Sequence, residues 1–314
     1  MIGIELLVVL AAIYLGARIG SIGIGFAGGL GVLVLTWGLG MPIPSDQLVT
    51  YLPWDVIMII ASVICAIACM QLAGGMDYLV HLAEKALRKN PKHITFAAPV
   101  VTYLMTMLAG TGHTAFSTLP VIAEVAKEQG IRPSRPLSIA VVASQIAITA
   151  SPISAAVVAF SGMLEPLGVD YLTLLAICIP SSFIACLLGA FIANLLGKPL
   201  DQDEVYLERK AKGLIKLRGT SQVEIKPYAK LSVGIFVASI VAVMAYATAI
   251  SGNVGLISSP PIPRDGAIMG IMLSAATLMV LFCKLDAAQI TNMPTFKSGM
   301  SACICVLGLS LIHI

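Results

Sequence analysis

Two polar islands interrupt an otherwise apolar sequence, and they restrict the fold more than any other feature. The first is GTGHT at Gly110–Thr114, and the second is QIAITASPIS at Gln145–Ser154. Hydrocarbon cannot hydrogen-bond an exposed backbone, so irregular Gly, Pro, Ser and Thr sequence at membrane depth is tolerated only inside protein or along a cavity. Transporters place their substrates at interrupted helices of this kind. We therefore predict that the two islands form half of a solute site.

The composition favours a membrane protein. Of the 314 residues, 58% are apolar and 11% are charged, whereas soluble domains carry about 25% charged residues. All seven cysteines lie in apolar runs, which predicts small buried side chains rather than a disulfide framework. The N-terminal residues include Glu5 and no basic stretch, so we expect a first membrane span rather than a cleaved signal peptide.

Apolar segments near the length of a spanning helix, about 20 residues, recur along the chain. We predict an all-α polytopic membrane protein in which residues 94–126 form a re-entrant hairpin with GTGHT near its turn. Residues 137–160 are expected to cross the membrane as a broken helix. The amphipathic segment Met76–Lys89 is expected to lie at the membrane interface. Further spans are predicted at 2–17, 22–39, 55–73, 171–196, 231–250, 266–282 and from about Gly299 onwards.

The basic residues divide the predicted loops into two sets. Of the nineteen Lys and Arg residues, all but Arg264 fall on one side of this topology. Cytoplasmic loops carry the excess of Lys and Arg, so the N-terminus is expected outside. Residues 198–230 would be a cytoplasmic connector between the spans of 1–197 and those of 231–314. The last span is expected to be truncated because it ends without an exit loop.

Groups at the islands suit a carboxylate ligand. Half-helix N-termini bind carboxylates through exposed N–H groups and the helix dipole, and hydroxyls can add donors, although hydroxyls also bond to their own helix. His113 is the only histidine at predicted membrane depth and could bind a carboxylate, carry a proton or serve the structure alone. The predicted substrate-binding residues are Gly110, Thr111, Gly112, His113, Thr114, Gln145, Thr149, Ser151, Pro152 and Ser154.

Three charged residues are candidates for the substrate path or a gate, namely Glu84, Arg88 and Arg132. Arginine binds carboxylates in a bidentate manner, which lysine cannot do. The alternative is structural, because Glu84 and Arg88 are spaced as a helical ion pair and basic residues anchor helices at the membrane interface.

Other functional classes are less compatible with this pattern. An intramembrane metalloprotease needs an HExxH motif, which the sequence lacks, and Ser161-Gly162 matches a serine protease GxSG motif only faintly. A channel would show a polar stripe or a charged ring rather than two breaks. We therefore predict a carrier and not an enzyme. A proton- or sodium-coupled organic-anion symporter is the alternative to an exchanger.

Six stretches carry a family resemblance: GARIGSIGIGFAGGLGVLVL from Gly16, AGGMDYLVHLAEKALRKNPKHIT from Ala73, LAGTGHTAFSTLPVIAEVAKEQGIRPSRPLS from Leu108, ASQIAITASPISAAVV from Ala143, LRGTSQVEIK from Leu217 and FKSGMSACICVLG from Phe296. Together they resemble the Dcu family of bacterial anaerobic C4-dicarboxylate antiporters, most closely the aspartate and fumarate branch. Residues Ser310–Ile314 depart from the family pattern, and family members continue well beyond them.

The resemblance implies an inner-membrane carrier that exchanges fumarate, malate, aspartate and succinate during anaerobic fumarate respiration. It implies an ion-transporter-like fold of two inverted repeats, each with a re-entrant hairpin and a broken helix. Residues 1–197 would be the first repeat and 231–314 the start of the second, truncated repeat, so the second half-site would lie in the missing C-terminal part. The expected partners are the dicarboxylates and the lipid bilayer, with no nucleic acid. No cofactor is expected beyond coupling to H⁺ or Na⁺, and a homo-oligomer stays an open alternative.

Overall fold

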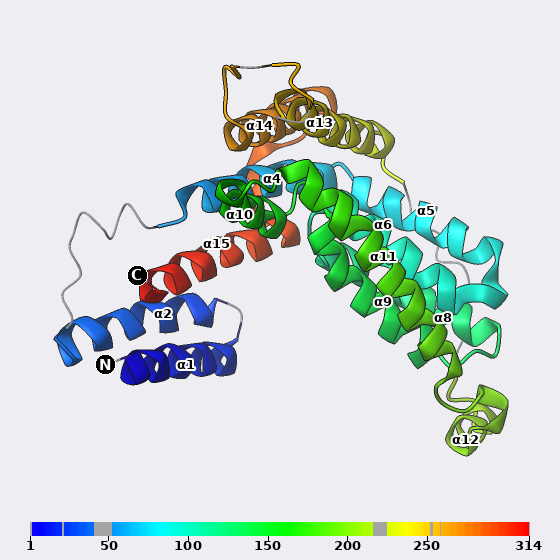
Figure 1. The fold of residues 1–314 in the computed structure, drawn as a ribbon. Coiled ribbons are helices and arrows are strands. Elements are labelled where there is room, and N and C mark those ends of the chain that lie inside the picture. The colour runs from blue at the N-terminus through cyan, green and yellow to red at the C-terminus, as the bar shows by residue number, and fades with distance from the viewer. Residues whose placement is uncertain are drawn as a thin grey trace.

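The computed structural model describes residues 2–20, 22–40, 52–215, 225–251, 254–257 and 259–313, without the side chains of residues 2, 113, 114, 155 and 313. Within these ranges every regular element is a helix (Figure 1). Five helices among the described residues are long and apolar enough to cross a membrane, which confirms the prediction of an all-α polytopic membrane protein. They are α4 (Trp54–Leu72), α11 (Tyr171–Leu195), α13 (Ala229–Ile250), α14 (Arg264–Phe282) and α15 (Pro294–His313).

The N-terminal helices pack against the C-terminal one. Helix α1 (Ile2–Ile19) lies along α2 (Gly23–Leu33), which continues as a π-helical turn over Val34–Gly38. A Cβ atom on Gly28 would lie 2.2 Å from the carbonyl oxygen of Gly308, so α2 and α15 meet backbone to backbone, as small residues allow between membrane helices. Helix α15 begins at Pro294 rather than near the predicted Gly299, since proline suits a first helical turn.

Helix α5 (Gly75–Lys89) has the predicted amphipathic character, and other helices cover part of its apolar face. Its apolar face, which includes Val80, Ala83 and Leu87, is buried against α6 (Ile94–Ala109) and α8 (Leu119–Glu128). Part of the face expected to meet the membrane interface is therefore covered by protein, whereas Leu82 on the same helix is exposed. The charged side, with Lys85 and Lys89, is exposed.

The chain between 94 and 128 folds back on itself. Helix α6 ends where Gly110 adopts a left-handed conformation with φ of 68°, which glycine reaches without a steric penalty. The short helix α7 (His113–Phe116) and then α8 follow. Ile94 and Ala98 at the start of α6 cluster with Ile122 and Val125 of α8. The GTGHT island therefore lies at the turn of a helical hairpin.

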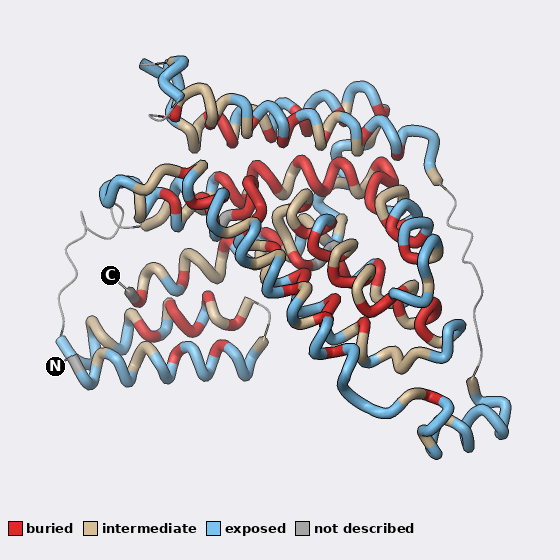
Figure 2. The backbone as a smooth tube through the Cα atoms, turned by 45° about the vertical axis from the view of Figure 1, so that its right-hand side comes forward, coloured by how far each residue is buried: buried red, intermediate tan, exposed pale blue. Residues whose placement is uncertain are grey.

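The second island breaks a helix in two. Helix α9 (Ser134–Ile146) ends in a 3₁₀ turn at Ala147–Ala150, residues 151–154 are irregular, and α10 (Ala155–Leu164) begins beyond them. Helices α6, α9 and α11 pack together around a buried cluster that includes Tyr103, Ala143 and Cys186. Figure 2 shows that buried residues lie mainly in the interior of the helix assembly. Thr102 Oγ1 donates to the carbonyl oxygen of Ala140 at 2.9 Å, which ties the hairpin to the broken helix.

The remaining elements surround this bundle. Helices α13 and α14 form a pair that packs on α4 (Figure 1). The predicted connector 198–230 contains an unexpected helix, α12 (Glu204–Ala211), capped by the Asp203 side chain, which accepts from the backbone N–H of Tyr206 at 3.0 Å. Short 3₁₀ turns occur at Pro91–His93, Glu165–Leu167, Leu200–Gln202 and Ala287–Asn292.

Candidate functional site

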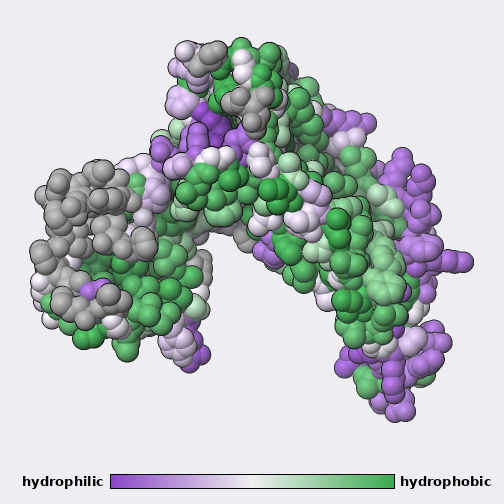
Figure 3. Space-filling model, viewed as in Figure 1, coloured by the Kyte–Doolittle hydropathy of each residue, from purple (hydrophilic) through white to green (hydrophobic). Residues whose placement is uncertain are grey.

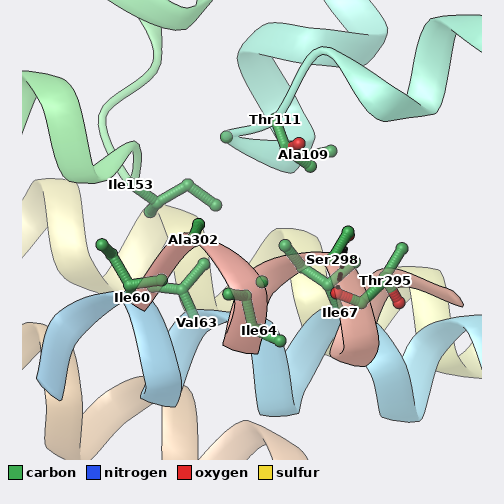
Figure 4. Close-up of a pocket in the computed structure, with 12 residues that line it drawn as sticks. Ile60, Val63, Ile64, Ile67, Ala109, Thr111, Ile153, Thr295, Ser298 and Ala302 are labelled. Carbon is green, nitrogen blue, oxygen red and sulfur yellow. Dashed lines mark hydrogen bonds between the residues drawn. The ribbon is translucent and has the colours of Figure 1, made fainter. Parts of the chain in front are cut away.

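The two polar islands meet at one cavity of about 170 Å³ (Figure 4). A Cβ atom on Gly110 would lie 3.2 Å from Ile153 Cγ1, so this glycine lets the hairpin turn approach the break in the second helix. A Cβ atom on Gly112 would lie 2.5 Å from Gln145 Nε2. Segments far apart in the sequence therefore touch at two points, as the prediction of a shared site requires.

Helices α4 and α15 complete the cavity wall. Ile60, Val63 and Ile67 of α4 form an apolar side, and α15 contributes Thr295 and Ser298 from its N-terminal turns (Figure 4). No charged side chain lines the cavity in the part of the chain that the structure describes. The full lining is Ile60, Val63, Ile64, Ile67, Ala109, Gly110, Thr111, Ile153, Thr295, Ser298, Gly299 and Ala302.

Thr295 and Ser298 were not among the predicted site residues. Thr295 Oγ1 donates to Gln71 Oε1 at 2.6 Å, and Ser298 Oγ donates to the carbonyl oxygen of Thr295 at 3.1 Å. Gln71 is the penultimate residue of α4, so its amide fixes the start of α15 beside the cavity. The only signal in the sequence is the Pro, Thr, Ser and Gly cluster at Pro294–Gly299, which precedes an apolar run.

The predicted hydroxyls of the second island hold the break rather than line the cavity. Ser154 Oγ donates to the carbonyl oxygen of Ile148 at 2.7 Å and accepts from the N–H of Val157 at 3.2 Å, which caps α10. Ser151 Oγ accepts from the N–H of Ile153 at 3.4 Å. Both serines are buried, and between them only Ile153 reaches the cavity. Thr149 is exposed and its hydroxyl donates to its own helix, to the carbonyl of Ile146 at 2.7 Å.

Tyr171 anchors the break from the far side. Its buried hydroxyl donates a short hydrogen bond to the carbonyl oxygen of Pro152. The Arg264 guanidinium lies 5.3 Å from the centre of the Tyr171 ring, within the range of a cation–π contact. The preceding residue, Asp170, accepts from Ser251 Oγ at 2.6 Å. The break is thus tied to α11, α13 and α14 by residues outside the predicted site.

The candidate gating residues lie away from the cavity. Arg88 pairs with Glu84 at 2.8 Å and with Glu128 at 2.7 Å, beside the start of α6. The hydrogen bond to Glu84 is the main cause that raises the pKa of Arg88. The cavity lies at the other end of this 16-residue helix, a distance of about 24 Å at 1.5 Å per residue.

Arg132 has a structural partner as well. It pairs with Asp203 at 3.2 Å, just before α12. A gating role for Glu84, Arg88 and Arg132 stays a prediction. The side chains of His113 and Thr114 fall outside the described part of the structure, so their predicted contacts with a substrate also stay predictions.

The structure combines helices long enough to span a membrane with a cavity between two helix breaks. Secondary transporters, a class of polytopic membrane proteins, bind their solutes in cavities of this kind. The chain belongs to the family of anaerobic C4-dicarboxylate membrane transporters, whose pattern it matches over residues 1–313. This family is one of transporters and not of enzymes, which confirms both the resemblance and the predicted class.

Similar proteins are known from several bacteria. The chain is 66% identical to the C4-dicarboxylate transporter DcuA of Wolinella succinogenes, over 99% of this chain and 70% of that protein. It is 54% identical to the protein of the same name from Escherichia coli strain K12, over 99% and 70% of the two chains. The corresponding protein of Helicobacter pylori strain J99 is 53% identical, over 98% and 68%. No solved structure gives a significant match.

Proposed function

We propose that this chain exchanges fumarate, malate, aspartate and succinate across the bacterial inner membrane by alternating access, with its N-terminus outside. Membership of the C4-dicarboxylate transporter family supports the class of substrate. The charge asymmetry of the loops supports the orientation. The observation that carries the proposal is the meeting of both helix breaks at one hydroxyl-bearing cavity.

Binding of a dicarboxylate in this cavity would rely on hydrogen-bond donors and helix dipoles. A buried carboxylate needs such partners because its transfer from water into an apolar site is costly. The N-terminal turns of α15 bring Thr295 and Ser298 to the cavity, and a helix N-terminus carries a partial positive charge that favours anions. Thr111 supplies a hydroxyl from the opposite wall.

One observation favours the alternative of cation coupling. Helix α6 ends at the cavity, with Ala109 and Gly110 in its wall. A helix C-terminus carries a partial negative charge, and half-helix C-termini coordinate coupling ions in other transporters. A proton- or sodium-coupled symporter of the same dicarboxylates is therefore the second candidate.

Counterflow separates the two candidates. The purified chain would be reconstituted in vesicles loaded with unlabelled succinate, and uptake of labelled fumarate would be followed with and without protonophore and sodium ionophore. Exchange predicts uptake that depends on internal succinate and resists both ionophores. Uptake that either ionophore abolishes would establish symport instead, and the absence of any dicarboxylate uptake would refute both.

A pair of threonine variants tests the cavity itself. Thr111→Val removes a hydroxyl from the cavity wall, whereas Thr149→Val removes an exposed hydroxyl that bonds to its own helix. Loss of one hydrogen bond to a charged group costs about 1.5–3 kcal/mol, so the KM for fumarate should rise at least tenfold in Thr111→Val. Equal KM values in the two variants would remove Thr111 from the site.

A further inference from the structure

A second hollow lies at the opposite end of the helical hairpin from the cavity. It is a cleft of about 870 Å³ between the end of α8, the following loop and α12. Lys127, Arg132 and Arg209 line it together with Asp203. Lys127 and Arg132 come from one stretch of the chain and Arg209 from another, about 80 residues later, so the fold brings the two parts together.

The charges of this basic cleft are only partly balanced. Arg132 pairs with Asp203 at 3.2 Å, and the other Asp203 oxygen accepts from the N–H of Tyr206 at 3.0 Å. The side chains of Lys127 and Arg209 have no ion-pair partner among the described residues. Among the described residues, the cleft therefore holds two positive charges outside any ion pair, which favours an anionic ligand.

The cleft also lies next to a membrane-spanning segment. Helix α11 ends at Leu195, and the guanidinium of Arg135 donates to the carbonyl oxygens of Leu196 at 2.7 Å and Gly197 at 2.6 Å just beyond it. Leu195 is 68% exposed, as expected of a side chain facing lipid, and the cleft begins a few residues later. Figure 3 shows hydrophilic residues gathered around α12, directly below the apolar surface of the bundle.

Apolar side chains accompany the cations. Val205 and Leu214 line the cleft and are 57% and 67% exposed. Exposed apolar side chains beside Lys and Arg are typical of protein surfaces that lie in the headgroup region of a bilayer. A free anion would need the cations but not this apolar edge. A phospholipid uses both, because its phosphate is joined to acyl chains.

We propose that the basic cleft binds the headgroup of an anionic phospholipid. Lys127 and Arg209 neutralise the phosphodiester, and Val205 and Leu214 contact the start of the acyl chains. Basic pockets at the ends of membrane helices bind anionic headgroups in this way. The bound lipid would fix α12 to the membrane surface. This lipid site stands whether or not the central cavity binds dicarboxylates.

The test is a lipid titration of the delipidated chain in detergent micelles, read by native mass spectrometry. Phosphatidylglycerol should bind more tightly than phosphatidylcholine. Each basic residue near a membrane surface contributes about 1 kcal/mol to binding anionic lipid, so Lys127→Gln with Arg209→Gln should weaken phosphatidylglycerol binding about 30-fold. The matched control is Lys85→Gln with Lys89→Gln, which removes two exposed charges outside the cleft.

A third variant tests the cleft by gain of affinity. Asp203→Asn keeps a side chain that can cap α12 but releases Arg132, so phosphatidylglycerol should bind about fivefold more tightly. If the cleft double variant and the control double variant lose equal affinity for phosphatidylglycerol, the attraction is general to the charged surface and the proposal is overturned. Displacement of the lipid by millimolar inorganic phosphate, or equal binding of phosphatidylcholine, would also overturn it.

Discussion

The hydrogen bond from Tyr171 to Pro152 offers a sharp test of how the break beside the cavity is held. Tyr171→Phe removes only the hydroxyl and keeps the buried ring under Arg264. Tyr171 is 4% exposed, so neither water nor lipid can readily replace the lost donor. A buried carbonyl left without a partner costs about 1–3 kcal/mol, which lowers the folding equilibrium constant by roughly one to two orders of magnitude.

Tyr246 provides a matched control within the same chain. Its hydroxyl also donates to a backbone carbonyl, that of Ile262, at 2.6 Å, but this pair is exposed. Water can satisfy the Ile262 carbonyl in Tyr246→Phe, so the cost should stay below about 1 kcal/mol. We therefore expect the same Tyr→Phe change to lower the free energy of unfolding by different amounts at the two positions, because one hydrogen bond is buried and the other is exposed.

The assay is reversible denaturant unfolding in micelles, followed by circular dichroism. The free energy of unfolding should fall by about 1–3 kcal/mol in Tyr171→Phe and by less than about 1 kcal/mol in Tyr246→Phe. Fumarate uptake by Tyr171→Phe should show a raised KM, since Ile153 in the cavity wall follows Pro152. Equal free-energy losses, together with an unchanged KM, would refute the reasoning.

Two further substitutions follow from the packing. Gly110→Ala places a side chain at φ of 68° and against Ile153, so the free energy of unfolding should fall by about 1–2 kcal/mol and the KM for fumarate should rise. In the control Gly130→Ala, φ is 69° and nothing lies near the added Cβ, so only the free energy of unfolding should fall. Similar KM values in the two variants would contradict this. Arg88→Gln leaves the nearly buried Glu84 without its ion-pair partner, so the free energy of unfolding should fall by about 1–3 kcal/mol. Lys85→Gln, on the exposed face, should leave the free energy of unfolding nearly unchanged; equal losses in the two variants would contradict this.

The sequence predicts the breaks because glycine and proline act locally. Gly110 ends α6 in a left-handed turn, and Pro152 lies in the irregular segment of the second helix, both where the polar islands indicated. These features depend on the backbone preferences of single residues and need no knowledge of the surroundings. The hydropathy of the segments, likewise local, was enough to predict an all-α membrane protein.

The direction in which each hydroxyl points could not be predicted in the same way. Ser151 and Ser154 lie in the predicted island, yet both bond to nearby backbone groups. A hydroxyl in a break can serve either the backbone or a ligand, and sequence does not separate the two. Thr295 is held beside the cavity by its hydrogen bond to Gln71, which lies 224 residues earlier in the chain. Its position therefore depends on tertiary packing.

Helix α5 illustrates a further limit. Its apolar stripe was predicted correctly, but the buried part of the stripe packs on α6 and α8. Lipid tails and apolar side chains cover such a stripe equally well, so periodicity alone does not identify the neighbour. Helix α12 was missed because its charged sequence carries no apolar period.

The central claim is that the two helix breaks and the start of α15 border one dicarboxylate cavity. Its most direct test is substrate protection of single cysteines, introduced as Thr111→Cys or Ser298→Cys after the seven native cysteines are replaced. Fumarate should slow maleimide labelling at both positions with the same concentration dependence, and leave Thr149→Cys unaffected. Labelling at Thr111→Cys and Ser298→Cys that fumarate does not slow, or protection that is equal at Thr149→Cys, would contradict the account.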